Sequence, residues 1–104
     1  MEHSEVYDLA GMLEHQPGAV VSRTLIKKEA GTVTLFAFDA GEGLSEHTAP
    51  YDALVLALNG QVEIRISGTP RTLAEGGAIL MPAGEPHSLT ALTPFKMLLV
   101  MVRA

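Results

Sequence analysis

The chain of 104 residues contains no cysteine and no tryptophan. The absence of cysteine excludes a disulfide framework and any thiolate ligand or nucleophile. No apolar run approaches the ~20 residues that a membrane-spanning helix needs. Residues 1–5 lack the basic and apolar pattern of a secretory signal peptide. These absences predict a cytoplasmic protein that does not enter a membrane.

Basic charge is also scarce. Seven Lys and Arg residues stand against twelve Asp and Glu residues, which gives a formal net charge of −5 at pH 7. A nucleic-acid-binding surface needs basic side chains that neutralise phosphates and, for single strands, aromatic side chains on which bases stack. Aromatic residues make up only 5% of the chain, and basic residues cluster only within residues 23–28. We therefore expect no nucleic-acid partner.

Apolar side chains, in contrast, are abundant, at 47% of residues against 18% charged. The length predicts a single domain over residues 1–104. Turn signals such as Pro17-Gly18, Asn59-Gly60 and Gly76-Gly77 recur between short aliphatic and β-branched runs, a pattern typical of an all-β sandwich or barrel. We expect an N-terminal arm over about residues 1–30, in which only residues 6–13 are candidates for a short helix, and a barrel over about residues 31–104.

The alternation within the runs predicts which strands are half exposed and which are covered twice. Val62, Ile64 and Ile66 share one face of a strand whose other face is polar. Residues 32–39, 54–58 and 98–102 are instead apolar on both faces, so both faces must be covered. The barrel interior covers one face. We expect a second subunit to cover the other, in a homodimer, with cover by the N-terminal segment as the alternative.

The Asn59-Gly60 dipeptide lies between two such runs. Asn-Gly is the strongest short hairpin signal, because both central residues of a type I′ turn have positive φ. The dipeptide therefore predicts that residues 53–58 and 61–67 are antiparallel neighbours.

Two histidines stand inside recognisable sequence frames. The first frame is Gly41-x5-His47, followed by an apolar run that stops at Gly60, and the second is Gly76-x5-Pro82-x-Gly84-x2-His87. Together they resemble the two motifs of the cupin superfamily. The resemblance implies an all-β double-stranded β-helix, which is a jelly-roll barrel with one open mouth toward which the motif residues point.

The chain departs from the family pattern at three positions. Ala49 and Ala53 stand where the first motif usually has a second His and a Glu, and Ala91 stands where the second motif usually has a polar residue. The alanines would open space in the mouth, which suits a small organic molecule. From strand alternation and the family frame, we expect a pocket lined by His47, His87, Ala49, Ala53, Ala91, Tyr51 and Met81.

His47 and His87 are also the candidate metal ligands, for Fe, Mn, Ni or Zn. Metal sites of this kind usually have a third protein ligand, often a carboxylate. Asp52 would serve only if a bulge re-aimed it, and His15 only if the N-terminal segment folded over the mouth. Glu46 and Glu85 flank the two histidines, and we expect them at the rim. Three interpretations stay open: a metal site, a metal-free pocket in which the histidines contact a ligand or act as an acid/base pair, and histidines that are only structural.

The sequence thus favours a small-molecule-binding cupin barrel whose ligand is unassigned. The alternative is a metal-dependent cupin enzyme of oxygenase, isomerase, lyase or decarboxylase type, for which fold analogy is the only support. A purely structural or interaction module is the third hypothesis, and it rests on the doubly apolar strands.

Overall fold

The computed structural model describes all 104 residues and consists almost entirely of β-strands. The 3-10 turn η1 (Leu9–Gly11) lies inside the segment in which the sequence allows a short helix. No helix has the length and apolar character that crossing a bilayer requires. The strands are β1 (Val20–Lys28), β2 (Gly31–Phe38), β3 (Gly43–His47), β4 (Tyr51–Asn59), β5 (Gln61–Ile66), β6 (Thr69–Ala74), β7 (Ala78–Met81), β8 (His87–Ala91) and β9 (Phe95–Arg103).

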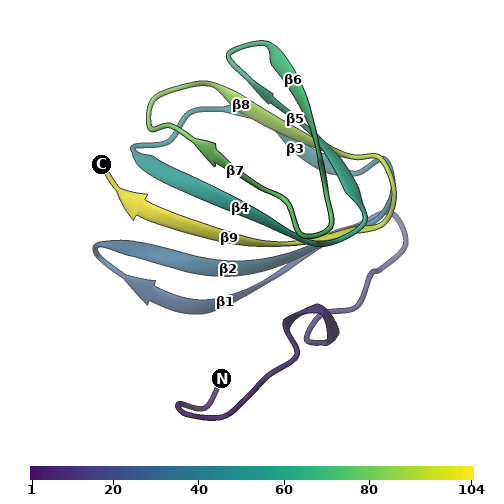
Figure 1. Ribbon diagram of the computed structural model, residues 1–104, viewed down its shortest axis with the longest axis vertical. Helices are drawn as coiled ribbons and strands as arrows, with labels where there is room; N and C mark the ends of the chain where they lie inside the picture. Colours follow the sequence, from purple (N-terminus) through teal and green to yellow (C-terminus); the bar gives the residue numbers. More distant parts are fainter.

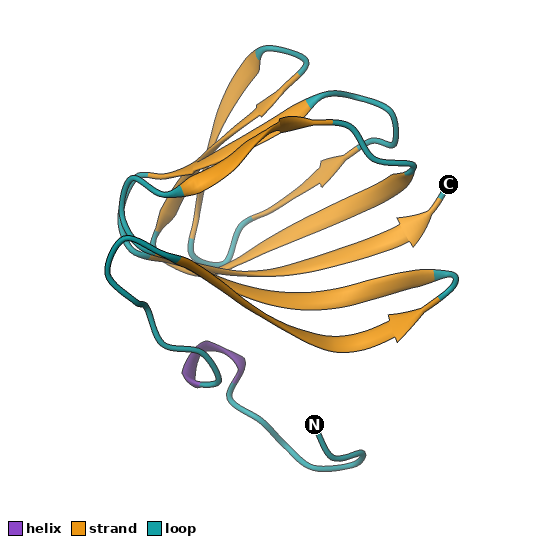
Figure 2. Ribbon diagram, turned by 180° about the vertical axis from the view of Figure 1, so that it is seen from behind, coloured by secondary structure: helices purple, strands orange, loops and turns teal.

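The strands form two antiparallel sheets that face each other across the core. The first, sheet A, has the order β1-β2-β9-β4-β7, and the second, sheet B, has the order β3-β8-β5-β6. Figure 1 shows the two sheets as the walls of a rolled barrel, with the N-terminal segment outside it, below β1. The view from behind in Figure 2 shows the same arrangement. The predicted double-stranded β-helix is thus confirmed.

The N-terminal arm is shorter than the sequence predicts. β1 lies within the expected arm, yet it pairs with β2 from Val20↔Phe38 to Lys28↔Gly31 and is an edge strand of sheet A. A bulge at Leu25 interrupts this pairing, and most of the side chains of β1 are exposed. A strand without a continuous buried stripe gives a weak period-two signal, so the sequence pattern places the start of the barrel after β1.

The hairpin predicted at Asn59-Gly60 is wrong. β4 pairs with β7 and β9, whereas β5 pairs with β6 and β8, so the dipeptide carries the chain from sheet A to sheet B. Gly60 has a φ of +76°, but Asn59 has no positive φ, so the turn is not of type I′. A Cβ on Gly60 would lie 2.1 Å from the carbonyl oxygen of Pro94. The glycine is therefore required by close backbone packing.

The type I′ signature instead occurs one strand later. Ser67 and Gly68 have φ values of 50° and 81°, and they connect the paired residues Ile66 and Thr69 of β5 and β6. Positive φ at both central residues is the requirement of this turn type.

The core fills the space between the sheets. Val62 and Ile64 are fully buried there, which confirms the predicted inner face of β5. Phe38 and Phe95, paired across β2 and β9, are also fully buried, and their ring centroids are 5.9 Å apart. These large side chains close one end of the barrel.

The outer face of sheet A is apolar as well, and the chain covers only part of it. Leu35 and Ala37 lie on this face yet are fully buried. The segment around η1 packs against β4, and Lys96 Nζ donates a hydrogen bond to the carbonyl oxygen of Ala10. The N-terminal segment therefore supplies some of the predicted second cover, and the homodimer stays a prediction.

Candidate functional site

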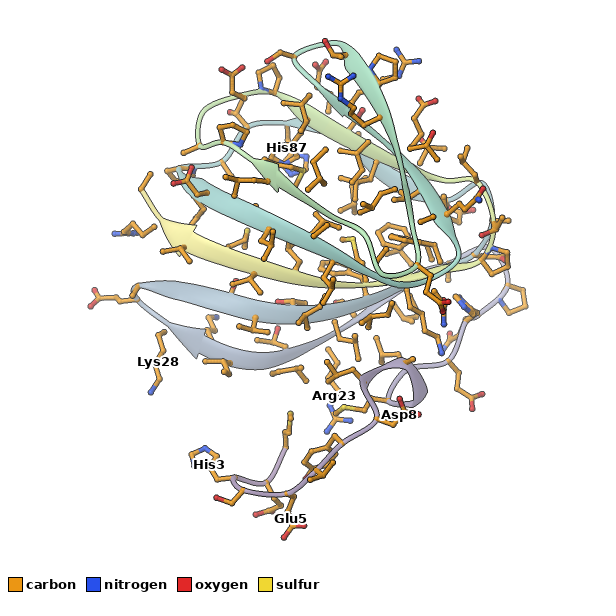
Figure 3. The ribbon with its side chains drawn as sticks, in the orientation of Figure 1. His3, Glu5, Asp8, Arg23, Lys28 and His87 are labelled. Atoms are coloured by element: carbon orange, nitrogen blue, oxygen red, sulfur yellow. The ribbon has the colours of Figure 1, made fainter.

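His47 and His87 lie side by side on neighbouring strands. β3 ends at His47, β8 begins at His87, and the two residues are register partners in sheet B. An irregularity between Leu44 and His47 re-aims the end of β3. In-register partners of antiparallel strands project to the same face, and Figure 3 shows His87 in the space between the two sheets.

The two imidazole rings are in direct contact. Their Nε2 atoms are 3.1 Å apart, and the rings meet edge to face, with centroids separated by 4.3 Å. His87 is the only buried polar residue of the chain, whereas His47 is exposed at the mouth. The pair therefore connects the interior of the barrel with solvent.

Both Nδ1 atoms face backbone carbonyls. His47 Nδ1 lies 2.7 Å from the oxygen of Ser45, and His87 Nδ1 lies 3.2 Å from the oxygen of Glu85. A carbonyl oxygen only accepts, so each contact is a hydrogen bond when Nδ1 carries the proton. If both Nδ1 atoms carry a proton, the two Nε2 lone pairs point at each other at 3.1 Å, which is repulsive.

A neutral pair cannot satisfy all these contacts at once. The shorter contact assigns the Nδ1 proton to His47, so His87 must donate from Nε2 and then leave its own Nδ1 without a proton against Glu85. All four nitrogen atoms are satisfied only when an additional proton or an external electron-pair acceptor lies between the two Nε2 atoms.

Burial disfavours the additional proton. Removal of His87 from water lowers the pKa of its imidazole, and the charge of a protonated His47 lowers it further, against an opposing hydrogen bond to Glu85. An external group is thus the better match for the Nε2 pair at neutral pH.

The cavity beside the pair is small and mostly apolar, with a volume of about 40 Å³. Its walls include five of the seven residues predicted to line the pocket: His47, His87, Ala49, Ala53 and Met81. The space is comparable to the ~30 Å³ that one water molecule occupies. Only a small chemical group can therefore reach the imidazoles without rearrangement of side chains.

Two predicted lining residues lie elsewhere. Ala91 pairs with Val62 four residues further along β8, so it belongs to the core below the cavity. Tyr51 begins β4, where its ring lies 5.9 Å from the guanidinium carbon of Arg103, and it does not line the cavity.

The predicted candidates for a third metal ligand do not join the pair. Asp52 points outward, and its Oδ1 accepts a hydrogen bond of 2.9 Å from the Ala83 amide. Glu46 and Glu85 are exposed, and Glu85 accepts a hydrogen bond from the Ser67 hydroxyl. His15 lies near Asp39, which follows β2 at the end closed by Phe38.

The chain therefore offers two ligand atoms to a metal ion, the Nε2 atoms of His47 and His87. No group of three His, Cys, Asp or Glu side chains is arranged to hold an ion. The 3.1 Å separation of the Nε2 atoms does suit two cis ligands, since bonds of ~2.1 Å to one ion then enclose an angle of about 95°.

Met97 and Met101 were not among the lining residues predicted from the sequence, yet both line the cavity together with Leu44, Leu89 and Leu99. Every second residue of a strand lies on the same face, so strand alternation places Met97, Leu99 and Met101 of β9 on one face. Both faces of β9 are apolar, however, so parity alone did not identify the inner one.

Comparison with known proteins shows the same architecture. Residues 34–102 match the family model described as a cupin domain. A conserved protein of unknown function from Streptococcus pyogenes is 39% identical, with a TM-score of 0.95 over 100% of this chain and 91% of that one. A cupin superfamily protein from Desulfitobacterium hafniense is 26% identical, with a TM-score of 0.94 over 100% and 95%.

A cupin 2 conserved barrel domain protein from Leptotrichia buccalis is 39% identical, with a TM-score of 0.91. The match covers 93% of this chain but only 47% of that one, so this chain spans about half the length of that relative. No curated protein matches the chain. The two histidine frames, the two-sheet barrel and the family match together show that the chain belongs to the cupin superfamily.

Proposed function

We propose that this barrel binds a small molecule at its mouth, and that the Nε2 atoms of His47 and His87 are the polar contacts. One observation carries the proposal: two Nε2 atoms stand 3.1 Å apart in an apolar cavity while both Nδ1 atoms face backbone carbonyls. A bound group that interacts with both lone pairs would relieve the conflict between them.

The geometry also limits the chemistry of the ligand. An Nε2 atom whose ring donates from Nδ1 is a hydrogen-bond acceptor, so it favours a ligand group that supplies a proton. The exposed carboxylates of Glu46, one residue before His47, and of Glu85, two residues before His87, disfavour an anion. A hydroxyl group fits the cavity of about 40 Å³, with the rest of the ligand outside the mouth, and its one proton can be shared between the two Nε2 atoms. The proposed ligand class is therefore a hydroxyl-bearing small molecule.

Calorimetric titration with a panel of sugars, polyols and hydroxy acids tests this proposal. His47→Phe and His87→Phe keep a ring in place but remove the acceptors, so we expect each to weaken binding by at least ~10-fold, the equivalent of one buried hydrogen bond. His15→Phe, away from the mouth, is the matched control. A ligand that binds the double variant as tightly as the wild type contradicts the proposal.

A metal-dependent enzyme is the second candidate, because metal-ligating histidines commonly donate their other ring N–H to a backbone carbonyl, as both Nδ1 positions allow here. His47 and His87 would hold a divalent ion, which would supply Lewis acidity, with water or ligand oxygens at the remaining positions. Ser45 and Glu85 would orient the rings through their carbonyls.

Elemental analysis of untagged protein incubated with Fe, Mn, Ni or Zn separates the two candidates. One equivalent of metal that is lost in both Phe variants supports the second candidate. Absence of binding for every ion contradicts it and leaves the metal-free pocket.

A further inference from the structure

A second cavity lies where an edge of one sheet faces an edge of the other. β7 is the last strand of sheet A and β6 is the last strand of sheet B, and no backbone hydrogen bond joins them (Figure 1). The cavity between them has a volume of about 380 Å³. We call it the seam groove, and it is lined by Ile66, Thr69, Arg71, Ile79, Leu80 and Pro82. None of these residues lines the cavity beside the histidine pair.

Aliphatic side chains form much of the seam groove. Ile66 of β5 and Ile79 of β7 are partly buried and pack against the core. Leu80 of β7 is 58% exposed, and Pro82 directly follows that strand. A cavity of this size that combines apolar walls with a few polar groups is the usual form of a small-molecule site.

The one charged side chain of the seam groove is that of Arg71. Arg71 lies two residues before the buried Leu73 on β6, and its register partner on β5 is the fully buried Ile64. Alternate residues of a strand and in-register partners share one face, so Arg71 and Thr69 project from the inner face of sheet B. The guanidinium of Arg71 is exposed and makes no hydrogen bond or ion pair within the chain. A free cation thus stands on a face that is otherwise built from apolar side chains.

No carboxylate lines the seam groove. Glu63 and Arg65 form the ion pair of the chain, and they lie on the other face of β5. Glu85 accepts a hydrogen bond from the Ser67 hydroxyl at the turn between β5 and β6. The positive charge of Arg71 is therefore not neutralised within the groove, and a ligand with a negative charge is its complement.

Two prolines argue against a peptide strand as the occupant. An unpaired strand edge can take up an extended peptide through main-chain hydrogen bonds. Pro70 stands within β6 and has no backbone N–H, and Pro82 stands at the end of β7. Proline on an edge strand protects that edge against pairing with another chain. The groove therefore suits a ligand that contacts side chains.

We propose that the seam groove binds a small molecule that has one carboxylate and an apolar body. The carboxylate lies at Arg71, because a planar guanidinium donates two parallel hydrogen bonds to such a group. The hydroxyl of Thr69 is a further donor on the same face. The apolar body covers Ile79 and Leu80 and removes their exposed surface from water. The site is separate from the histidine pair and does not depend on what the mouth binds.

Phenylacetate and hexanoate are suitable probes, because each joins one carboxylate to an apolar body. In 1H–15N correlation spectra of the labelled full chain at pH 7, both should shift the amide signals of the groove residues Ile66, Thr69, Arg71, Ile79 and Leu80. Phenylacetamide keeps the ring without the charge, and acetate keeps the charge without the ring. We expect each of these two to bind at least ~10-fold more weakly than phenylacetate.

Four variants at exposed positions assign the contacts. Arg71→Gln should weaken phenylacetate binding at least ~10-fold and abolish its preference over phenylacetamide. Arg65→Gln, on the same hairpin but on its other face, is the matched control and should bind as the wild type does. Leu80→Ser should weaken phenylacetate binding several-fold, whereas Leu92→Ser, similarly exposed but outside the groove, should not. Circular dichroism verifies that each variant is folded.

Three results overturn the proposal. The first is that neither acid shifts the groove amides at millimolar concentration. The second is equal affinity of phenylacetate and phenylacetamide, or of the wild type and Arg71→Gln. The third is a set of shifts centred on His47 and His87, which would place the acid at the mouth of the barrel.

Discussion

The inner and outer faces of sheet A are made from similar side chains, yet they have different neighbours. On β9, the inward Phe95 and Met97 are fully buried against sheet B, whereas the outward Val102 is more than half exposed. Composition does not distinguish the two faces. The difference shows that a buried environment is set by register and by what covers the strand.

The largest expected effect comes from the inner face. Phe95→Ala should lower the free energy of unfolding by about 3–5 kcal/mol, because it removes a fully buried ring and leaves a cavity. Urea denaturation of wild type and variant at one fixed protein concentration measures this loss. A loss below ~1 kcal/mol would mean that the closed end is not a packed core.

On the outer face of sheet A, the same kind of truncation should change the stability of a single chain little and act mainly on association between chains. Leu54→Ala should change the stability of the monomer by under ~1 kcal/mol, because the side chain is already 41% exposed. If the homodimer that the sequence predicts forms through this face, the truncation weakens it, so the melting temperature should fall and become less dependent on protein concentration. Differential scanning calorimetry over a hundred-fold concentration range verifies this, and a concentration-independent loss of several kcal/mol would place Leu54 in the monomer core.

At the mouth, removal of a polar side chain should not destabilise the protein. His87→Phe eliminates a buried imidazole that a neutral pair cannot fully satisfy, so we expect the ligand-free protein to keep or gain ~0.5–1 kcal/mol while ligand binding is lost. Urea denaturation of wild type and variant measures the difference. A loss above ~1 kcal/mol would show that the pair is a structural contact.

The smallest effect concerns the attachment of the N-terminal cover. Asp39 accepts hydrogen bonds from the amides of Gly18 and Ala40, which lower the pKa of its carboxyl group. A carboxyl pKa that is lower in the folded protein adds stability above its ordinary value of ~4, and this stability disappears as the pH falls through the folded value. Asp39→Asn should therefore reduce stability slightly at pH 7 and flatten its decline below about pH 4, which acid titration followed by circular dichroism measures. If Asp39→Asn leaves the loss of stability at acid pH unchanged, Asp39 does not have this role.

Strand alternation and the histidine frames were sufficient to predict the barrel and the meeting of His47 with His87. Turn type was harder to predict, because Asn59-Gly60 has the favoured dipeptide but connects two sheets, whereas the less typical Ser67-Gly68 adopts the type I′ conformation. A local motif does not encode which strands pair across the barrel. Doubly apolar strands such as β9 likewise do not reveal which side faces the cavity, so Met97 and Met101 were not assigned to it.

The protonation of His47 tests the account of the mouth most directly. Long-range 1H–15N correlation spectra of the ligand-free protein near pH 7 report which ring nitrogens carry hydrogen. We predict that His47 is protonated at Nδ1, facing the carbonyl of Ser45, and that its unprotonated Nε2 shifts when a ligand binds. His47 protonated only at Nε2 would contradict the account, because the cavity would then lack the acceptor on which the proposed function rests.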